Sequence, residues 1–151
     1  MIYKSTSMIT SVYVLRFEDC LTLEWSSAQT ARSSPCTYSC AAVRLTEHQA
    51  QTLLRLLQLF QDLVNLPLAP SGEGRLFFSL GAIAVTIRLN PVYDLYELII
   101  QVKKHRVSED VRVLEELILY PQEAQALADE IEKALACEAP CESKEVAHAA
   151  N

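Results

Sequence analysis

The segment LTEHQAQTLL at residues 45–54 recurs in altered form as LYPQEAQALA at residues 119–128, 74 positions further along the chain. Four positions are identical in this frame: Leu45 and Leu119, Ala50 and Ala124, Gln51 and Gln125, and Leu53 and Leu127. Each copy follows a stretch of alternating apolar residues and opens a stretch with helical spacing. The repetition therefore predicts that the chain contains the same strand-to-helix unit twice.

The first half reads as strands followed by one helix. Alternating apolar residues predict strands over 12–17 and 20–25, with Glu18 and Asp19 in the turn between them. A polar loop over 26–36 precedes a further strand over about 37–45. Thr46 and Gln49 have the spacing of a capping box, and apolar residues then recur at steps of three and four up to Val64. A buried helix is therefore expected after residue 46.

The second half repeats this scheme. Strands are expected over 76–80, 82–89 and 94–105, and over 111–120 with or without a bulge near Glu115 and Glu116. Pro121 suits the first turn of a second helix, since its missing N–H has no partner there. In the third of these strands, one face carries Tyr96, Leu98, Ile100 and Val102, and the other carries Glu97, Gln101, Lys103 and His105. The predicted core of the two helices consists of Leu53, Leu57, Leu127 and Ile131.

These elements predict an α+β fold made of a duplicated β-β-β-(β)-α unit. We expect two antiparallel curved sheets and two related helices with pseudo-twofold symmetry, because one sheet with one helix leaves an apolar face that a second copy can close. The first unit spans residues 1–66, a linker 67–74, the second unit 75–136 and a mobile tail 137–151.

Composition favours a soluble cytoplasmic protein. The chain has a formal net charge of −6 and half its residues are hydrophobic, yet its apolar runs are shorter than the ~20 residues of a membrane span. The N-terminus has no continuous apolar region and does not read as a signal peptide. Five cysteines, an odd number, favour reduced thiols over a disulfide framework.

A duplicated sheet-plus-helix unit of this length resembles the PUR-repeat, Whirly and positive-cofactor-four group of single-stranded nucleic-acid binders. In that group the strand entering the helix ends in leucine, a cap and, three residues after the cap, glutamate or glutamine. This phrase matches Leu45, Thr46 and Gln49, and again Leu119, Tyr120 and Glu123. The resemblance covers roughly residues 8–136 and implies single-stranded DNA or RNA as the ligand. The chain departs from the group in being acidic, and no nucleic-acid-contacting motif can be carried over.

One basic strip is the candidate binding site. Phosphates need cations, and bases need flat side chains on which to stack. The strip consists of Arg88, Tyr93, Lys103, Lys104, His105, Arg106 and Arg112. Its other interpretation is a solvated hairpin end, where alternating Lys and Arg discourage edge-to-edge pairing.

No catalytic motif stands out, so we expect a nonenzymatic protein without a cofactor. His48, His105 and His148 lack a neighbouring nucleophile of known type, and the chain has no Gly-rich phosphate loop. Cys36 and Cys40 share their spacing with Cys137 and Cys141, a set that four-coordinate zinc accepts, although buried or idle thiols are the simpler interpretation.

Two functional hypotheses follow. The first is single-stranded nucleic-acid binding through one sheet face. The alternative is a protein-interaction module that acts through the first helix, which is apolar over more than half its circumference and predicts a homodimer or another protein partner.

Overall fold

Each half of the chain forms a four-stranded antiparallel sheet and ends in a helix. The structure, a computed structural model, describes residues 1–5, 8–29, 37–65, 75–90, 95–103 and 116–137. The first half contains β1 (Ile2–Ser5), β2 (Met8–Phe17), β3 (Cys20–Gln29), β4 (Thr37–Thr46) and α1 (Glu47–Asn65). The second contains β5 (Arg75–Leu80), β6 (Ile83–Asn90), β7 (Leu95–Val102), β8 (Glu116–Leu119) and α2 (Pro121–Ala136).

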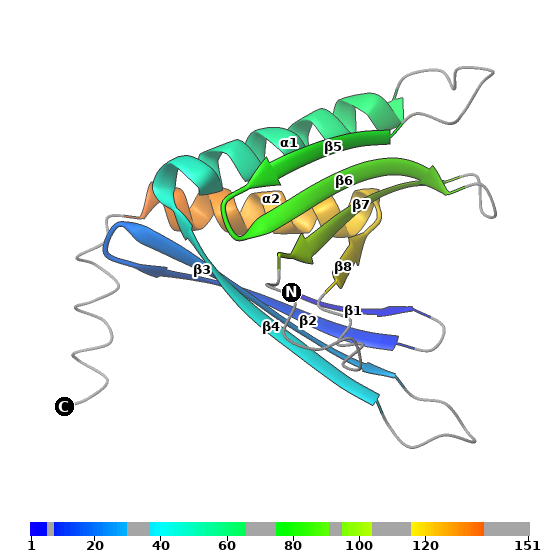
Figure 1. Cartoon of the computed structure of the whole chain (residues 1–151), viewed down its shortest axis with the longest axis horizontal. Helices are drawn as coiled ribbons and strands as arrows, with labels where there is room; N and C mark the ends of the chain where they lie inside the picture. The colour runs from blue at the N-terminus through cyan, green and yellow to red at the C-terminus, as the bar shows by residue number, and fades with distance from the viewer. Residues whose placement is uncertain (6–7, 30–36, 66–74, 91–94, 104–115, 138–151) are drawn as a thin grey trace.

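The two sheets have the same strand order. Their orders are β1-β2-β3-β4 and β5-β6-β7-β8, so each is an antiparallel meander that leads into its helix (Figure 1). Leu119 is the last residue of β8 and Leu45 is the last but one of β4, and both are fully buried. The predicted α+β fold with a duplicated unit is confirmed, and the repeated sequence marks the two strand-to-helix junctions.

Local helix signals also hold. The Thr46 backbone N–H donates to Oε1 of Gln49 over 3.0 Å, and the Gln49 N–H donates to Oγ1 of Thr46 over 3.2 Å. This reciprocal pair is the predicted capping box. Pro121 occupies the first turn of α2, as predicted. Both helices therefore begin where the sequence places them.

The structure differs from the sequence predictions at β1, β2 and β3; β3 extends to Gln29, through residues 26–29 of the predicted loop. β1 was not predicted, and β2 begins at Met8 rather than at Val12. β1 is held by pairing with β2, and Met1 exchanges two hydrogen bonds with Val12, of 2.8 Å and 2.6 Å. Such pairing between segments leaves no local pattern in a four-residue strand. β8 is described over Glu116–Leu119 only, and the predicted linker and nearly all of the predicted tail lie outside the described residues.

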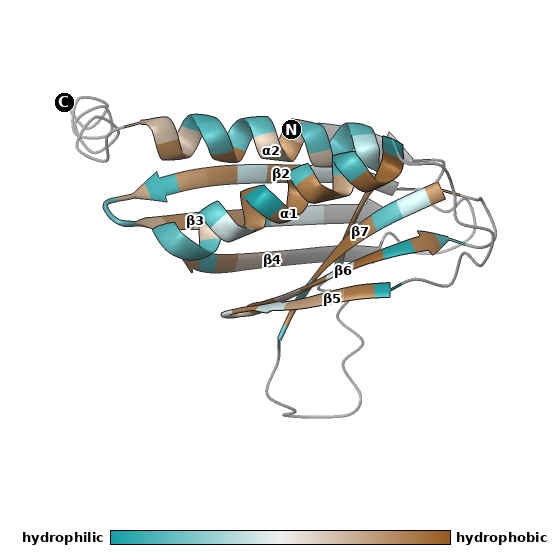
Figure 2. Ribbon diagram, turned by 90° about the horizontal axis from the view of Figure 1, so that it is seen from above, coloured by the Kyte–Doolittle hydropathy of each residue, from teal (hydrophilic) through white to brown (hydrophobic). Residues whose placement is uncertain are grey.

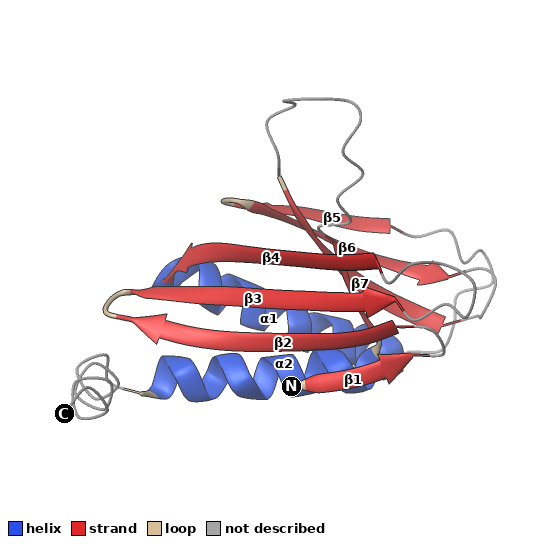
Figure 3. Cartoon of the chain, turned by 90° about the horizontal axis from the view of Figure 1, so that it is seen from below, coloured by secondary structure: helices blue, strands red, loops and turns tan. Residues whose placement is uncertain are grey.

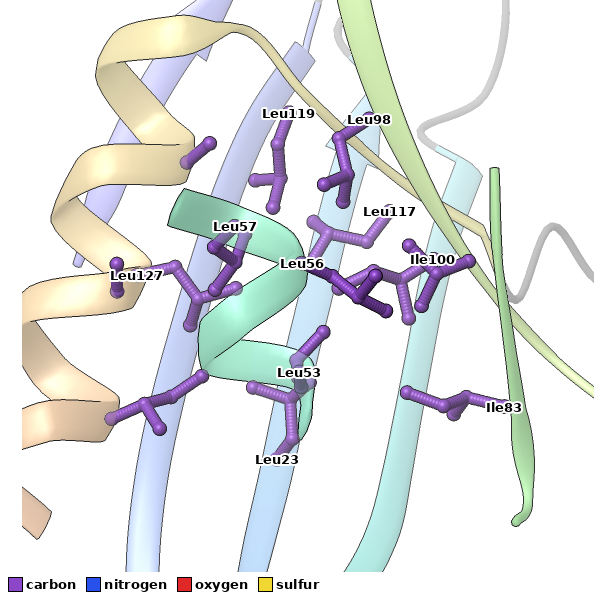
Figure 4. Close-up of a cluster of buried hydrophobic side chains, with 14 of the residues drawn as sticks. Leu23, Leu53, Leu56, Leu57, Ile83, Leu98, Ile100, Leu117, Leu119 and Leu127 are labelled. Atoms are coloured by element: carbon purple, nitrogen blue, oxygen red, sulfur yellow. The ribbon is translucent and has the colours of Figure 1, made fainter. Parts of the chain in front are cut away.

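The two helices pack against each other and between the two sheets. α1 contacts β3 and β4 of the first sheet and β5 and β7 of the second, while α2 contacts β2, β7 and β8. Figure 2 shows both helices lying over the first sheet, with polar and apolar residues along each. Leu53, Leu57, Leu127 and Ile131 are fully buried, which confirms the predicted helix core. Figure 4 shows the first three of these residues in the buried cluster.

Candidate binding surface

Two of the seven predicted strip residues can be placed. Arg88 lies in β6, and Lys103 follows β7 directly. The other five lie outside the described residues: Tyr93, Lys104, His105, Arg106 and Arg112. The position of the strip as a whole therefore stays a prediction.

Arg88 is engaged in an ion pair. Its Nε lies 2.6 Å from Oε1 of Glu97, the residue directly opposite in β7, and Nδ2 of Asn90 lies 3.5 Å from Oε2 of the same carboxylate. Glu97 stands on the face predicted from strand alternation, but it is only 1% exposed. A buried carboxylate needs a partner charge. Arg88 supplies that charge, and little of its positive charge is available for a phosphate.

Lys103 lies at the other end of the same sheet face. Its backbone N–H donates to the carbonyl oxygen of Ala82 over 2.8 Å, and its ammonium group donates to Oγ of Ser79. Ala82 is six positions before Arg88, so the backbones of Lys103 and Arg88 lie roughly 20 Å apart along the sheet at about 3.3 Å per residue. Lys103 is exposed, as predicted, while Leu98 and Ile100 on the opposite face are buried.

A different surface stands out in the first sheet. Tyr13, Leu15 and Phe17 in β2 are 51%, 40% and 57% exposed, and all three lie on one face of the strand. β2 is an interior strand of this sheet, between β1 and β3. The helices cover the opposite face, so the sheet seen from below lies in front of both helices (Figure 3). We call this surface the first-sheet face; its described side chains are Ser11, Tyr13, Leu15, Phe17, Cys20, Thr22, Glu24, Ser26, Ala42, Arg44 and Thr46.

The β2–β3 turn explains why these apolar residues face outward. Phe17 pairs with Cys20 across a two-residue turn, in which Glu18 adopts a positive φ of 53°. In that register Leu15 pairs with Thr22, and directly paired residues share a face. The alternate residues Leu21, Leu23 and Trp25 therefore point to the core, together with Val12. The alternation in β2 predicts a strand. Only the register across the turn shows which of the two alternating sets of side chains is exposed.

Charges on the first-sheet face are few and opposite in sign. Arg44 is directly opposite Thr22, and Glu24 is directly opposite Ala42, so the two lie at diagonal positions on β3 and β4. Tyr13 and Phe17 stand four residues apart, roughly 14 Å along the strand at about 3.4 Å per residue. The face therefore offers two rings and a leucine in a row beside one cation and one anion. This chemistry suits stacking and apolar contact more than phosphate binding.

The apolar circumference of α1 is covered within the monomer. Ala50, Leu53, Leu56, Leu57 and Phe60 are buried, and Leu54, Leu63 and Val64 pack against the core from partly buried positions. Leu59, at 37%, is the one large hydrophobic residue exposed on this helix. The sequence argument for a partner on α1 assumed that one small sheet covers this helix. Both sheets and α2 cover it instead.

The described residues include only part of the predicted zinc-ligand set. No three His, Cys, Asp or Glu side chains come together there in an arrangement that holds a metal ion. Cys36 and Cys141 lie outside this part of the chain, the side chain of Cys40 is not described, and Cys137 is exposed after α2. His48 is exposed at the start of α1. Within the described ranges, neither helix is long and apolar enough to cross a membrane.

Comparison with known proteins adds no family. No protein-family model matches the sequence, and no characterised protein matches it significantly. The function must therefore be argued from the surface itself.

Proposed function

We propose that this protein is a noncatalytic binding protein that binds single-stranded nucleic acid through the first-sheet face. The observation that carries this proposal is the exposure of Tyr13 and Phe17 on one face of an interior strand of an open antiparallel sheet. Exposed rings on a sheet are stacking platforms for unpaired bases. The duplicated sheet-plus-helix architecture, which resembles the PUR-repeat and Whirly group, supports the same ligand class.

The charges of the face predict how such binding behaves. Arg44 is the one cation among its described side chains, and Glu24 lies beside it. Each phosphate that a cation neutralises contributes about 0.7 to the salt slope of single-strand binding. Binding that rests on stacking with a single cation has a shallow slope, near that value. Stacking is worth about 1–3 kcal/mol per base, so each ring accounts for roughly fivefold or more in affinity.

The experiment is fluorescence anisotropy with a labelled oligothymidine at low salt. Tyr13→Ala and Phe17→Ala each weaken binding by about fivefold or more, and the double variant weakens it further. Leu59→Ala is the matched control, because it removes an exposed apolar side chain from α1. Arg44→Ala lowers the salt slope by about 0.7. An absence of binding by the wild type at about 100 micromolar, where nonspecific binders normally register, contradicts the proposal.

A protein ligand on the same face is the second candidate. It is favoured by the opposite charges of Glu24 and Arg44 at diagonal positions, by the ion pair that occupies Arg88, and by the net charge of −6. Contiguous exposed apolar residues with a balanced rim are typical of protein-interaction surfaces. The anisotropy experiment separates the two candidates, since a face that binds protein and not nucleic acid gives no signal with the oligonucleotide.

A further inference from the structure

The edge strand β5 is unusually apolar. It pairs with β6 over its full length, and no other strand among the described residues pairs with it. Phe77 is 65% exposed and Leu76 is 42% exposed on the opposite face of the strand. Exposed sheet edges are normally protected by charges, proline or bulges. Residues 76–80 read LFFSL and contain no charge or proline, so this edge suits pairing with another strand.

The hydrogen-bonding parity of β5 follows from its neighbours. The Ala82 carbonyl accepts from Lys103, so the backbone groups at Ala82 point toward β7. Backbone groups alternate sides along a strand, so those of Ile83 and Val85 point toward β5. Their partners in β5 are Leu80 and Phe78. The N–H and C=O groups of the alternate residues, Arg75, Phe77 and Ser79, therefore point to the free edge.

From this parity we infer that two copies of the chain associate through antiparallel pairing of β5 with β5 around a twofold axis at Phe77. In this register Phe77 lies opposite its own counterpart, and Arg75 lies opposite Ser79 of the second copy. Both pairs use backbone groups that point to the free edge. In both pairs the side chains of the two copies lie on the same face of the joined sheet. The two four-stranded sheets become one sheet of eight strands.

Side chains in this register fit a second copy of the same strand. The two Phe77 rings become cross-strand neighbours on the outer face, and Leu76 meets Phe78 of the partner on the helix face. The two Arg75 side chains stand four residues apart and do not face each other; each lies opposite Ser79 of the second copy, whose hydroxyl accepts from the Lys103 ammonium. Figures 2 and 3 place β5 at the margin of the second sheet, and α1 lies beside it in Figure 1 and contacts it. The dimer is thus independent of the first-sheet face.

The test is the molar mass of the full chain by light scattering across a concentration series. The wild type is expected to be a dimer at tens of micromolar. Phe77→Lys places two like charges on the axis and raises the dimer dissociation constant at least tenfold. The matched control is Phe17→Lys, which adds the same charge at a comparably exposed phenylalanine of the other sheet and leaves the dimer intact. If the wild type is still a monomer at a protein concentration of about 100 micromolar, any self-association is weak and the inference is overturned.

A second measurement does not depend on the lysine variant folding. Directly opposed residues of an antiparallel pair have Cα atoms about 5.5 Å apart, within disulfide reach. Under mild oxidation Phe77→Cys is expected to form cross-linked dimers well above the wild-type background. Phe17→Cys is expected to stay at that background. Equal cross-linking by these two variants rejects the β5 register.

Discussion

Arg16 of β2 and Leu135 of α2 are joined by a hydrogen bond: Nη1 of the arginine donates to the leucine carbonyl oxygen over 2.9 Å. The same nitrogen donates to the carbonyl oxygen of Ala134, also over 2.9 Å, and Nη2 lies 3.5 Å from Oε2 of Glu47. The guanidinium group therefore connects the end of α2 with the start of α1. A cation at the carboxyl end of a helix also interacts favourably with the helix dipole.

Arg16→Ala is expected to lower the free energy of unfolding by about 1–3 kcal/mol, since two hydrogen bonds to carbonyls and the dipole interaction are lost together. Arg16→Lys keeps the charge but not the planar donor group, and should show a smaller loss. Urea unfolding measures both variants. Arg55→Ala, an exposed arginine on α1, is the control and should change the free energy of unfolding by less than about 0.5 kcal/mol. A loss of less than about 0.5 kcal/mol for Arg16→Ala would show that the contacts of Arg16 with the two helices contribute little to stability.

Leu127→Ala is expected to cost about 2–5 kcal/mol, because Leu127 is fully buried and its removal leaves a cavity between α2 and the rest of the core. Thermal and urea unfolding measure this loss. Gln122→Ala, at an exposed position of the same helix, is the control and should stay within about 0.5 kcal/mol. A cost below 1 kcal/mol for Leu127→Ala would contradict the role assigned to this leucine.

The sequence predicts those parts of the fold that depend on neighbouring residues. The helix stripe containing Leu53 and Leu127 follows from a spacing of three and four, and the capping box of Thr46 and Gln49 from two side chains three apart. β1 escapes prediction because its four residues depend on pairing with β2. The local sequence pattern therefore predicts the core residues of the helices and the strand-to-helix junctions. The full extent of the sheets depends on pairing between distant segments.

The candidate surface was harder to predict than the fold. Tyr13 and Leu15 look like core residues, because every position from 12 to 15 in β2 is apolar. Their exposure follows from the pairing of Phe17 with Cys20 across the predicted turn at Glu18 and Asp19, which places Tyr13 and Leu15 on the same face as Thr22 and Glu24. Arg88 was predicted as part of the basic strip. Its pairing with Glu97 could not be predicted, because strand alternation does not show that this carboxylate is buried.

Gly81 connects the two halves through close packing on Gln49. It has a positive φ of 57°, and a Cβ atom at this position would lie 2.9 Å from Cδ of Gln49. Gly81→Ala is expected to cost about 1–3 kcal/mol, since it adds left-handed backbone strain to the clash. The Gln49→Ala background removes the clash and leaves the backbone strain, so the cost of Gly81→Ala should be smaller there. Equal costs in both backgrounds, measured by urea unfolding, would assign the effect to the backbone.

The ion pair between Arg88 and Glu97 is expected to matter for stability. Arg88→Ala leaves a buried carboxylate without its partner charge and should cost about 3 kcal/mol. Adding Glu97→Gln removes the buried charge, so the double variant should be more stable than Arg88→Ala. Circular dichroism during urea unfolding measures both. Independent, additive losses would show that the two residues are not coupled. Because of this expected loss, Arg88→Ala is a poor probe of ligand binding.

Cys20 offers a chemical readout of the first-sheet face. Burial raises the pKa of its thiol, and a hydrogen bond to Oδ1 of Asp19, 3.5 Å away, and the charge of that carboxylate raise it further. The thiolate is the reactive form, so a raised pKa means slower alkylation at pH 8 than an ordinary cysteine shows. Asp19→Asn removes the charge of Asp19, lowers the pKa, and should shift the pH profile of alkylation to lower pH.

Peptide mass spectrometry after short iodoacetamide pulses measures this profile for each cysteine. Cys137, exposed after α2, is the internal control, and its rate should not respond to Asp19→Asn. Cys20 lies directly opposite Phe17, so a ligand stacked on that ring should also cover the thiol. Saturating oligothymidine is therefore expected to slow alkylation of Cys20 and leave Cys137 unchanged. Binding that leaves the Cys20 rate unchanged would place the nucleic-acid site on another surface of the protein.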